Sequence, residues 1–121
     1  DWATDKLLKS YWNKIIYIYK ENWGVASALN LWIKKMTWEY FSWLSHDDLY
    51  FENKIEEQVN LLWTLDNIEN IIPFSNYIFI NENGKEINKI EIKYNQKEFL
   101  YKLVINSFLN WCTMLIPKKA F

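Results

Sequence analysis

The residue types that can carry out chemistry gather in one short segment of this chain. His46, Asp47 and Asp48 are consecutive, and a histidine beside a carboxylate is an arrangement that acid/base catalysts use. Such residues also serve as capping and solvent-exposed groups in the first turn of a helix, and Ser45 with Asp48 has the spacing of a capping box. We therefore expect residues 46–52 to form a short helical turn, with no catalytic residue among them.

The remaining reactive residues give no recognisable site. Cys112 is the single cysteine and is expected to be a small core residue, because no histidine lies near it in the sequence. One cysteine and one histidine cannot build a zinc site alone. Only Gly24 and Gly84 are available, so a glycine-rich phosphate loop is absent from the sequence. The chain is accordingly expected not to be an enzyme and to use no metal and no cofactor.

Composition narrows the class of protein further. The chain has 121 residues, of which 50% are hydrophobic and 19% aromatic, so we expect one folded domain over residues 1–121. The formal net charge is −1 and all fourteen basic residues are lysine, which disfavours nucleic-acid binding. No apolar run approaches the roughly 20 residues that a membrane span needs. Together with the lone cysteine, this predicts the cytoplasm or another reducing intracellular compartment, with the mitochondrial matrix as the alternative.

The codon usage implied by the composition is biased. The frequent Ile, Asn, Lys, Tyr and Phe are what AT-rich coding produces, so lysine and asparagine carry little functional information here. The eight tryptophans do not follow from that bias in the standard code, which leaves selection for these rings or a genetic code that reads TGA as tryptophan.

The hydrophobic pattern places one long helix at the centre of the fold, over residues 55–72. Its apolar positions fill two adjacent helical stripes, and Pro73 ends it. The stripes consist of Ile55, Val59 and Leu62, and of Leu61, Leu65, Ile68 and Ile72. A helix that is apolar over so wide an arc is expected to contact every other element.

The rest of the chain is predicted to supply three further helices and a hairpin. Helical spacing of apolar residues covers residues 5–21, residues 25–43 and the segment from Asn95 to the residue before Pro117. A hairpin over residues 77–94 follows from the Asn83-Gly84 dipeptide, with Ile80 facing Ile87. Because Ile87 and Ile90 have opposite parity, either a bulge lies near Asn88-Lys89 or the loop is longer. The fold class is therefore α+β, mainly α: a small bundle of about four helices around 55–72, with one hairpin.

Helix 25–43 carries more apolar surface than one face can bury. Leu31, Trp38 and Phe41 lie beside the stripe that runs from Val25 to Trp43, near Lys34 and Ser42. These three residues either pack in an aromatic core or form an exposed patch for a partner. We name Leu31, Trp38 and Phe41 as the candidate partner-binding residues.

Two short segments resemble a bacterial family of unknown activity. Glu56, the run Leu61-Leu62-Trp63-Thr64-Leu65, and the later Leu109-Asn110-Trp111 are similar to the signature of the domain of unknown function 4272 family. Asn53 and Lys54 stand where that family has Trp and Arg, and the segment between the two motifs is shorter. The resemblance implies no activity.

The favoured function is therefore a non-catalytic protein–protein interaction domain, either an immunity or inhibitor protein or an accessory subunit of a larger assembly. A protein partner or a homo-oligomer follows from the aromatic excess and from the free edge of the hairpin. The alternative is a domain whose aromatic helices line a pocket for a small molecule.

Overall fold

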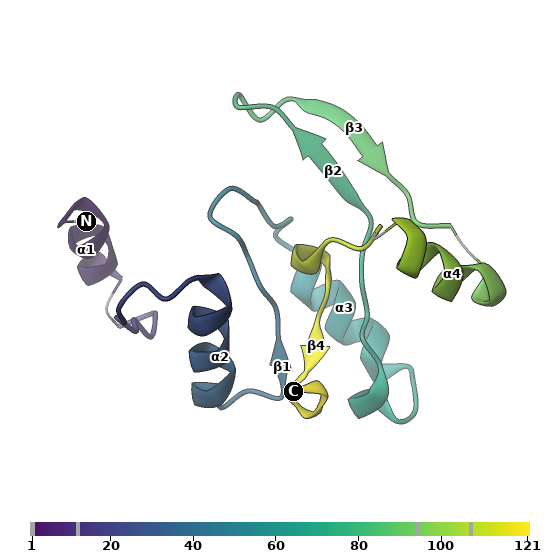
Figure 1. Ribbon diagram of the computed structural model, residues 1–121, viewed down its shortest axis with the longest axis horizontal. Coiled ribbons are helices and arrows are strands. Elements are labelled where there is room, and N and C mark those ends of the chain that lie inside the picture. The colour runs from purple at the N-terminus through teal and green to yellow at the C-terminus, as the bar shows by residue number, and fades with distance from the viewer. Residues whose placement is uncertain (1, 12, 94, 107) are drawn as a thin grey trace. The chain divides into compact units, whose positions relative to one another are not determined.

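The computed structural model describes residues 2–11, 13–93, 95–106 and 108–121. The chain forms two compact units, residues 1–35 and residues 36–121. Within the described residues there are four α-helices and two small antiparallel sheets (Figure 1). These are α+β elements, while the bundle around a central helix and the single domain over 1–121 stay predictions.

The first unit contains two helices, α1 (Trp2–Ser10) and α2 (Val25–Lys35). Asp5 and Lys9 form an ion pair of 2.7 Å one turn apart on α1. Compared with the predicted helix over residues 5–21, α1 begins earlier, at Trp2, and ends much earlier, at Ser10. Gly24, which has a φ of +84°, leads into α2 and accepts a hydrogen bond from the amide of Ala28. Glycine adopts this left-handed conformation without steric cost, so it turns the chain into α2.

The second unit begins where helix 25–43 was expected to continue. Instead, strand β1 (Tyr40–Phe41) pairs antiparallel with β4 (Ile116–Pro117). The amide of Lys118 extends this pairing to the carbonyl of Glu39, at 2.7 Å. The prediction of one helix through Trp43 is wrong, because backbone pairing with a segment more than 70 residues away replaces the helical hydrogen bonds.

The second unit contains helix α3 (Lys54–Trp63), which is shorter than the predicted helix over residues 55–72. The hydroxyl of Thr64 donates to the carbonyl of Leu61 at 2.7 Å. Asn67 then takes a left-handed conformation with a φ of 55°, which a short amide side chain tolerates and which ends helical geometry. A 3₁₀ turn, η1 (Ile68–Asn70), follows. The carbonyl of Ile68 accepts a hydrogen bond from the hydroxyl of Tyr40, so this segment is held by the β1 strand.

The core of the second unit is small. Its buried hydrophobic side chains among the described residues are Leu62, Leu115 and Ile116. Gln58 is also buried, and its amide nitrogen donates to the carbonyl of Thr113 at 2.7 Å and to that of Pro73 at 3.5 Å. A side chain of α3 thus ties together two segments that lie far apart in the sequence.

The predicted hairpin is present as β2 (Tyr77–Ile80) and β3 (Glu86–Ile90). Tyr77 pairs with Ile90, but Ile80 pairs with Glu86, and the register shifts between Phe79 and Ile80. The loop is longer than two residues, since the amide of Asn81 donates to the carbonyl of Lys85. The expected pairing of Ile80 with Ile87 is therefore wrong, and the parity conflict is resolved by a longer loop and an irregularity close to it. Tyr94, the last residue of the predicted hairpin, lies outside the described residues.

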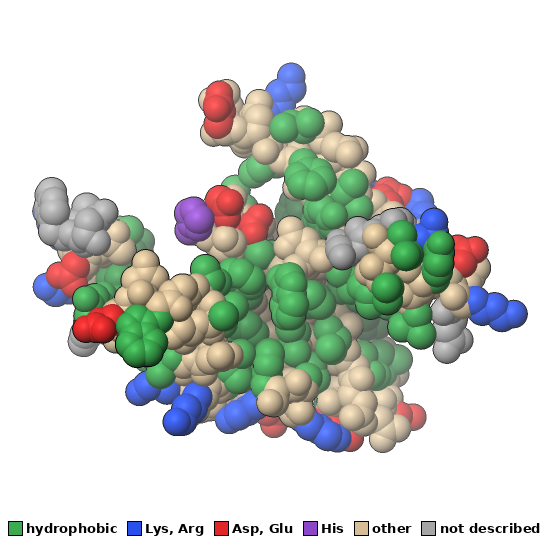
Figure 2. Space-filling model, in the orientation of Figure 1, with side chains coloured by type: hydrophobic (Ala, Val, Ile, Leu, Met, Phe, Trp, Pro, Cys, Tyr) green, Lys and Arg blue, Asp and Glu red, His purple; other side chains and the backbone are tan. Residues whose placement is uncertain are grey.

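The last predicted helix is divided into two parts. Helix α4 (Gln96–Asn106) covers its first half, and a 3₁₀ helix, η2 (Trp111–Thr113), follows before β4. A further 3₁₀ turn, η3 (Lys118–Ala120), follows β4. Hydrophobic side chains remain at the surface of α4 and of the hairpin (Figure 2). Among the described residues, no helix combines the length and the apolar character that crossing a membrane requires.

Replacing Gln58 by Ala is expected to lower the free energy of unfolding by about 1–3 kcal/mol. The carbonyl of Thr113 would lose its side-chain donor while remaining in a buried segment, since Thr113 is itself buried. Urea unfolding followed by circular dichroism measures this change. The control is Glu57→Ala, the truncation of an exposed side chain of the same helix, which should change stability by less than about 0.5 kcal/mol. Equal effects of the two substitutions would show that the buried hydrogen bonds of Gln58 contribute nothing to stability.

Candidate functional site

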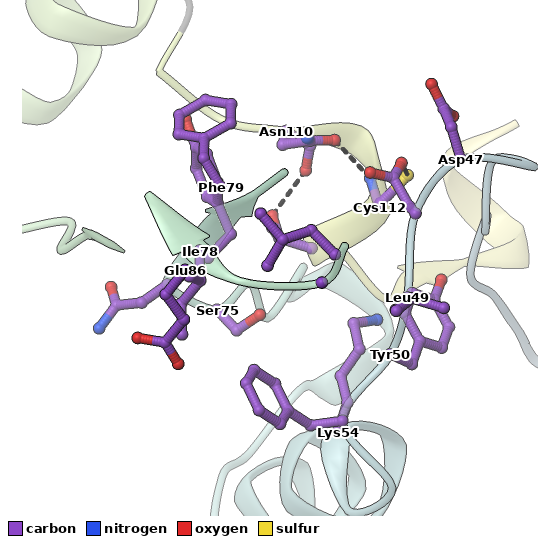
Figure 3. A pocket seen from close by; sticks show the side chains of 17 residues that line it. Asp47, Leu49, Tyr50, Lys54, Ser75, Ile78, Phe79, Glu86, Asn110 and Cys112 are labelled. Atoms are coloured by element: carbon purple, nitrogen blue, oxygen red, sulfur yellow. Dashed lines mark hydrogen bonds between the residues drawn. The ribbon is translucent and has the colours of Figure 1, made fainter. Parts of the chain in front are cut away.

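The second unit contains a cavity of about 360 Å³ between the hairpin, α3 and the segment before β4 (Figure 3). Its wall is made by residues of the segments 47–51 and 75–80, by Lys54, Gly84 and Glu86, and by Asn110, Cys112 and Thr113. The wall combines aromatic rings with carboxylates, amides and one lysine. This is the mixture found in sites that bind small polar molecules.

Asp48 is held in this wall by Cys112. The Sγ of Cys112 donates to Oδ2 of Asp48 at 2.7 Å. The amide of Cys112 in turn donates to Oδ1 of Asn110 at 3.0 Å, which caps the short helix η2. Oδ1 of Asp48 has no hydrogen-bond partner in the part of the chain that the structure describes. One oxygen of Asp48 is thus oriented by the protein, while the other remains able to accept a hydrogen bond from a ligand.

Asp47 lies beside Asp48 but is exposed, in a turn closed by a hydrogen bond from the amide of Asp48 to the carbonyl of Ser45. The hydroxyl of Ser45 donates to Oδ1 of Asp47 at 2.7 Å and lowers the pKa of that carboxyl. The expected helical turn over 46–52 is replaced by this tight turn and extended chain. Asp47 and Asp48 therefore line a cavity instead of capping a helix.

His46 does not belong to the cavity wall. Its side chain is 95% exposed, and its Nδ1 lies 3.9 Å from Oδ1 of Asp47. This position agrees with the expectation that His46 is a solvent-exposed group. The capping-box interpretation of Ser45 and Asp48 is wrong, because the two consecutive aspartates follow strand β1 and do not start a helix.

Lys54 lies in the same wall at the first residue of α3. Its Nζ donates to Oγ of Ser42 at 3.0 Å and lies 4.2 Å from the centre of the Tyr50 ring. Ser42 also donates to the carbonyl of Met114 at 3.1 Å, and the hydroxyl of Tyr50 donates to the carbonyl of Trp43 at 2.6 Å. Burial lowers the pKa of Lys54 and raises that of Tyr50. This network fixes both side chains against the cavity.

The hairpin supplies the aromatic part of the wall. The rings of Tyr77 and Phe79 meet edge to face with 5.5 Å between their centres. Asn76 stands next to them and accepts a hydrogen bond from the amide of Ile92. Figure 3 shows Phe79 and Ile78 on the hairpin side and Asn110 and Cys112 on the other side. A ligand in this cavity would contact apolar rings and polar groups together.

Two adjacent carboxylates of the wall are the groups that could contribute ligands to a metal ion. Across the described ranges, no three His, Cys, Asp or Glu side chains are grouped so that they could hold a metal ion by themselves. One or two carboxylates are, however, what Mg²⁺ ordinarily takes from a protein when substrate oxygens complete its ligand set. Asp47 and Asp48 are the residues that could contribute to such a set.

The three candidate partner-binding residues do not lie on one helix. Leu31 is half-buried in α2 of the first unit. In the second unit, Trp38 is 76% exposed, and Phe41 is half-buried in β1, where its ring meets that of Phe121 edge to face at 5.8 Å. The partner-binding role of Leu31, Trp38 and Phe41 stays a prediction.

The Cys112 thiol is expected to titrate above the ordinary thiol pKa of about 8.5. Burial is the largest cause of the raised pKa of Cys112, and the hydrogen bond to Asp48 acts in the same direction. Because the folded protein favours the neutral thiol, this contribution to stability is complete below the pKa of the unfolded thiol. It is lost as the pH rises through the higher pKa of the folded state.

The pH dependence of iodoacetamide alkylation measures the pKa of Cys112. In Asp48→Asn the pKa should fall, since the negative carboxylate beside the thiol is removed. A wild-type thiol that titrates at or below its ordinary pKa would contradict the observed contact between Cys112 and Asp48.

Comparison with known proteins identifies the family of this chain. The profile of Glycosyl transferase family 2 matches residues 3–121. An uncharacterized glycosyltransferase of Rickettsia typhi is 43% identical over 98% of this chain and 38% of its own length. One from Rickettsia felis is 43% identical over 98% of this chain and 20% of its own length. The chain thus spans less than two-fifths of these relatives, and no solved structure matches it significantly.

These findings overturn three of the sequence-based expectations. The resemblance to the domain of unknown function 4272 family is wrong, because the matching profile over nearly the whole chain is a different one. Two of the residues that carried this resemblance, Leu61 and Trp63, lie in the short helix α3. The non-catalytic interaction domain and the statement that the chain is not an enzyme are also wrong, since both comparisons point to glycosyltransferases. The chain belongs to Glycosyl transferase family 2.

Proposed function

We propose that this chain is the part of a glycosyltransferase that binds a sugar, and that the cavity of the second unit is the binding site. The observation that carries the proposal is the position of Asp47 and Asp48 in a cavity wall that also holds aromatic rings and amides. Family membership supplies the class of reaction.

The wall suits the chemistry of a sugar. Sugar hydroxyls donate hydrogen bonds to carboxylate and amide oxygens, and Asp47, Asp48, Asn76 and Asn110 provide such acceptors. The C–H faces of a sugar ring are apolar and pack on aromatic rings such as that of Phe79. A cavity of about 360 Å³ lies within the range of small-molecule sites, roughly 300–1,000 Å³.

A charged group close to the reacting carbon can accelerate glycosyl transfer. The bond between the anomeric carbon and the leaving group breaks, a bond to an acceptor oxygen forms, and the acceptor hydroxyl gives up its proton. A positioned carboxylate can take this proton or stabilise the positive charge that develops on the sugar. We assign this place to Asp48, because Cys112 orients one of its oxygens and the other has no partner within the described residues.

A panel of monosaccharides tests the proposal through ligand-observed NMR with the whole chain. At least one sugar should bind, and Phe79→Ala should weaken its binding by about 3- to 10-fold, since an aromatic contact contributes on the order of 0.5–1.5 kcal/mol. The matched control is Tyr101→Ala, an exposed aromatic residue of α4 that does not line the cavity. The proposal fails if no sugar binds, or if the two variants weaken binding equally.

A further inference from the structure

Gln58 is a buried glutamine whose side-chain amide is only half satisfied. Its Nε2 donates to the carbonyl of Thr113 at 2.7 Å and to that of Pro73 at 3.5 Å. Its Oε1 is also buried but accepts no hydrogen bond from any described residue. A buried acceptor without a partner costs free energy, which an apolar side chain of similar size would avoid. Such departures from full hydrogen bonding concentrate at functional sites, so the Gln58 donor points to a role beyond packing.

The carbonyl that Gln58 holds belongs to a tightly closed turn. The amide and the hydroxyl of Thr113 both donate to the carbonyl of Asn110, at 2.9 and 2.6 Å. The amide of Cys112 donates to Oδ1 of the same asparagine at 3.0 Å (Figure 3). The 3₁₀ helix η2 and its cap are therefore one small unit, and the hydrogen bond from Gln58 attaches this unit to α3.

This turn carries the thiol that orients Asp48. The Sγ of Cys112 donates to Oδ2 of Asp48 at 2.7 Å across 64 positions of sequence, and both residues line the cavity. A contact between two distant segments keeps its geometry only if each segment is held in place. Because η2 has only three residues, its own hydrogen bonds cannot fix its position, and its contact with the core through Gln58 does so.

Resting on the proposed function, we infer that Gln58 is a positioning residue for Asp48. Its hydrogen bond to Thr113 fixes η2, and η2 in turn places the Cys112 thiol against the carboxylate. Gln58 does not line the cavity, so it acts through these groups and does not contact the sugar. Without its donor η2 can move, and the carboxylate of Asp48 then loses the thiol that orients it.

The rate at which iodoacetamide alkylates Cys112 at one fixed pH tests this placement without any sugar. Gln58→Met keeps the approximate size of the side chain and removes the donor. It should speed alkylation by about 3-fold or more, because the thiol loses its hydrogen bond and becomes more accessible. Glu57→Met, the same new side chain at an exposed position of α3, should keep the wild-type rate. A wild-type rate in folded Gln58→Met overturns the inference.

The Asp48→Ala background separates positioning from a general loosening of the fold. The contact with Cys112 is already absent there, so adding Gln58→Met should change the alkylation rate by less than about 1.5-fold. Equal acceleration in both backgrounds would show that Gln58 only tightens the fold, and would overturn its positioning role.

Hydrogen exchange in the wild type keeps the inference testable if Gln58→Met does not fold. The side-chain amide protons of Gln58 and the backbone amides of Cys112 and Thr113 should show similar protection, because they open together. Exchange of the Gln58 protons more than about 10-fold faster than that of the two backbone amides would show that Gln58 does not hold η2.

Glycosyl transfer provides a second readout, which separates this inference from the proposed function. Gln58→Met should slow the bound complex by about 3- to 10-fold with little change in affinity for the sugar, and Asp48→Asn should mask most of that loss. If Asp48→Asn slows transfer and Gln58→Met does not, the positioning role falls and the sugar site stands. If Asp48→Asn leaves transfer unchanged, the role proposed for Asp48 falls, and the alkylation rates still decide whether Gln58 places the thiol.

Discussion

Replacing Asp48 by Asn is expected to reduce glycosyl transfer by about 100-fold or more, because a carboxylate positioned at the reacting centre contributes roughly 10²- to 10⁴-fold to such a reaction. Asparagine keeps the shape of the side chain and can still accept the hydrogen bond from Cys112. What it removes is the negative charge. The loss should therefore appear in the rate of the bound complex more than in the affinity for the sugar.

The measurement is the rate at which the activated form of the sugar identified by binding loses its leaving group, with water or an added acceptor. Asp66→Asn provides the matched control, since Asp66 is an exposed aspartate after α3 that does not line the cavity. His46→Ala should also leave the rate nearly unchanged, because that side chain is exposed to solvent and does not line the cavity. An Asp48→Asn rate within a few-fold of wild type would contradict the role given to Asp48.

Asp47 is expected to matter less than Asp48 as a proton acceptor. The hydroxyl of Ser45 lowers the pKa of Asp47, and a carboxyl with a lowered pKa is a weaker base. Asp47→Asn should thus cause a smaller loss of rate than Asp48→Asn, and the two variants together separate the roles of neighbours that the sequence presents as equivalent.

Local patterns predicted those parts of the fold that depend on neighbouring residues. The Asn83-Gly84 dipeptide and the β-branched residues around it identified the hairpin, and Gly84 has the positive φ expected of it, 75°. The parity conflict between Ile87 and Ile90 also correctly indicated an irregular register or a longer loop. Hairpins are readable from sequence because their two strands are close together along the chain.

Helix lengths could not be predicted in the same way, because distant segments decide them. The pairing of Tyr40–Phe41 with Ile116–Pro117 competes with helix formation across a long interval of sequence, and helical periodicity alone gives no sign of it. The candidate site shows the same limit. Asp48 and Cys112 are 64 positions apart, so their contact follows from the fold, whereas each residue by itself resembles a cap or a small core residue.

Replacing Leu62 by Ala is expected to lower the free energy of unfolding by about 2–5 kcal/mol, the cost of removing a fully buried leucine and leaving a cavity. Leu62 is the most buried large side chain of the described residues, at 2% exposure, and it lies on the inner side of α3. Because few other hydrophobic side chains among the described residues of this unit are buried, other contacts cannot compensate for the lost packing. A small domain has only about 5–15 kcal/mol of stability in total, so a large part of it would be removed.

Urea unfolding measures the free energy of unfolding of Leu62→Ala and of its control Leu61→Ala, a substitution at the adjacent residue of the same helix. Leu61 is 50% exposed, so the same truncation removes little buried area and should cost far less. Amide exchange provides a second measurement, and the amides of α3 around Leu62 should exchange more slowly than those of the β2–β3 hairpin, because a two-stranded hairpin is marginally stable by itself. Equal costs for the two leucine variants, or slowest exchange in the hairpin, would show that the stability of the second unit is centred elsewhere than on α3.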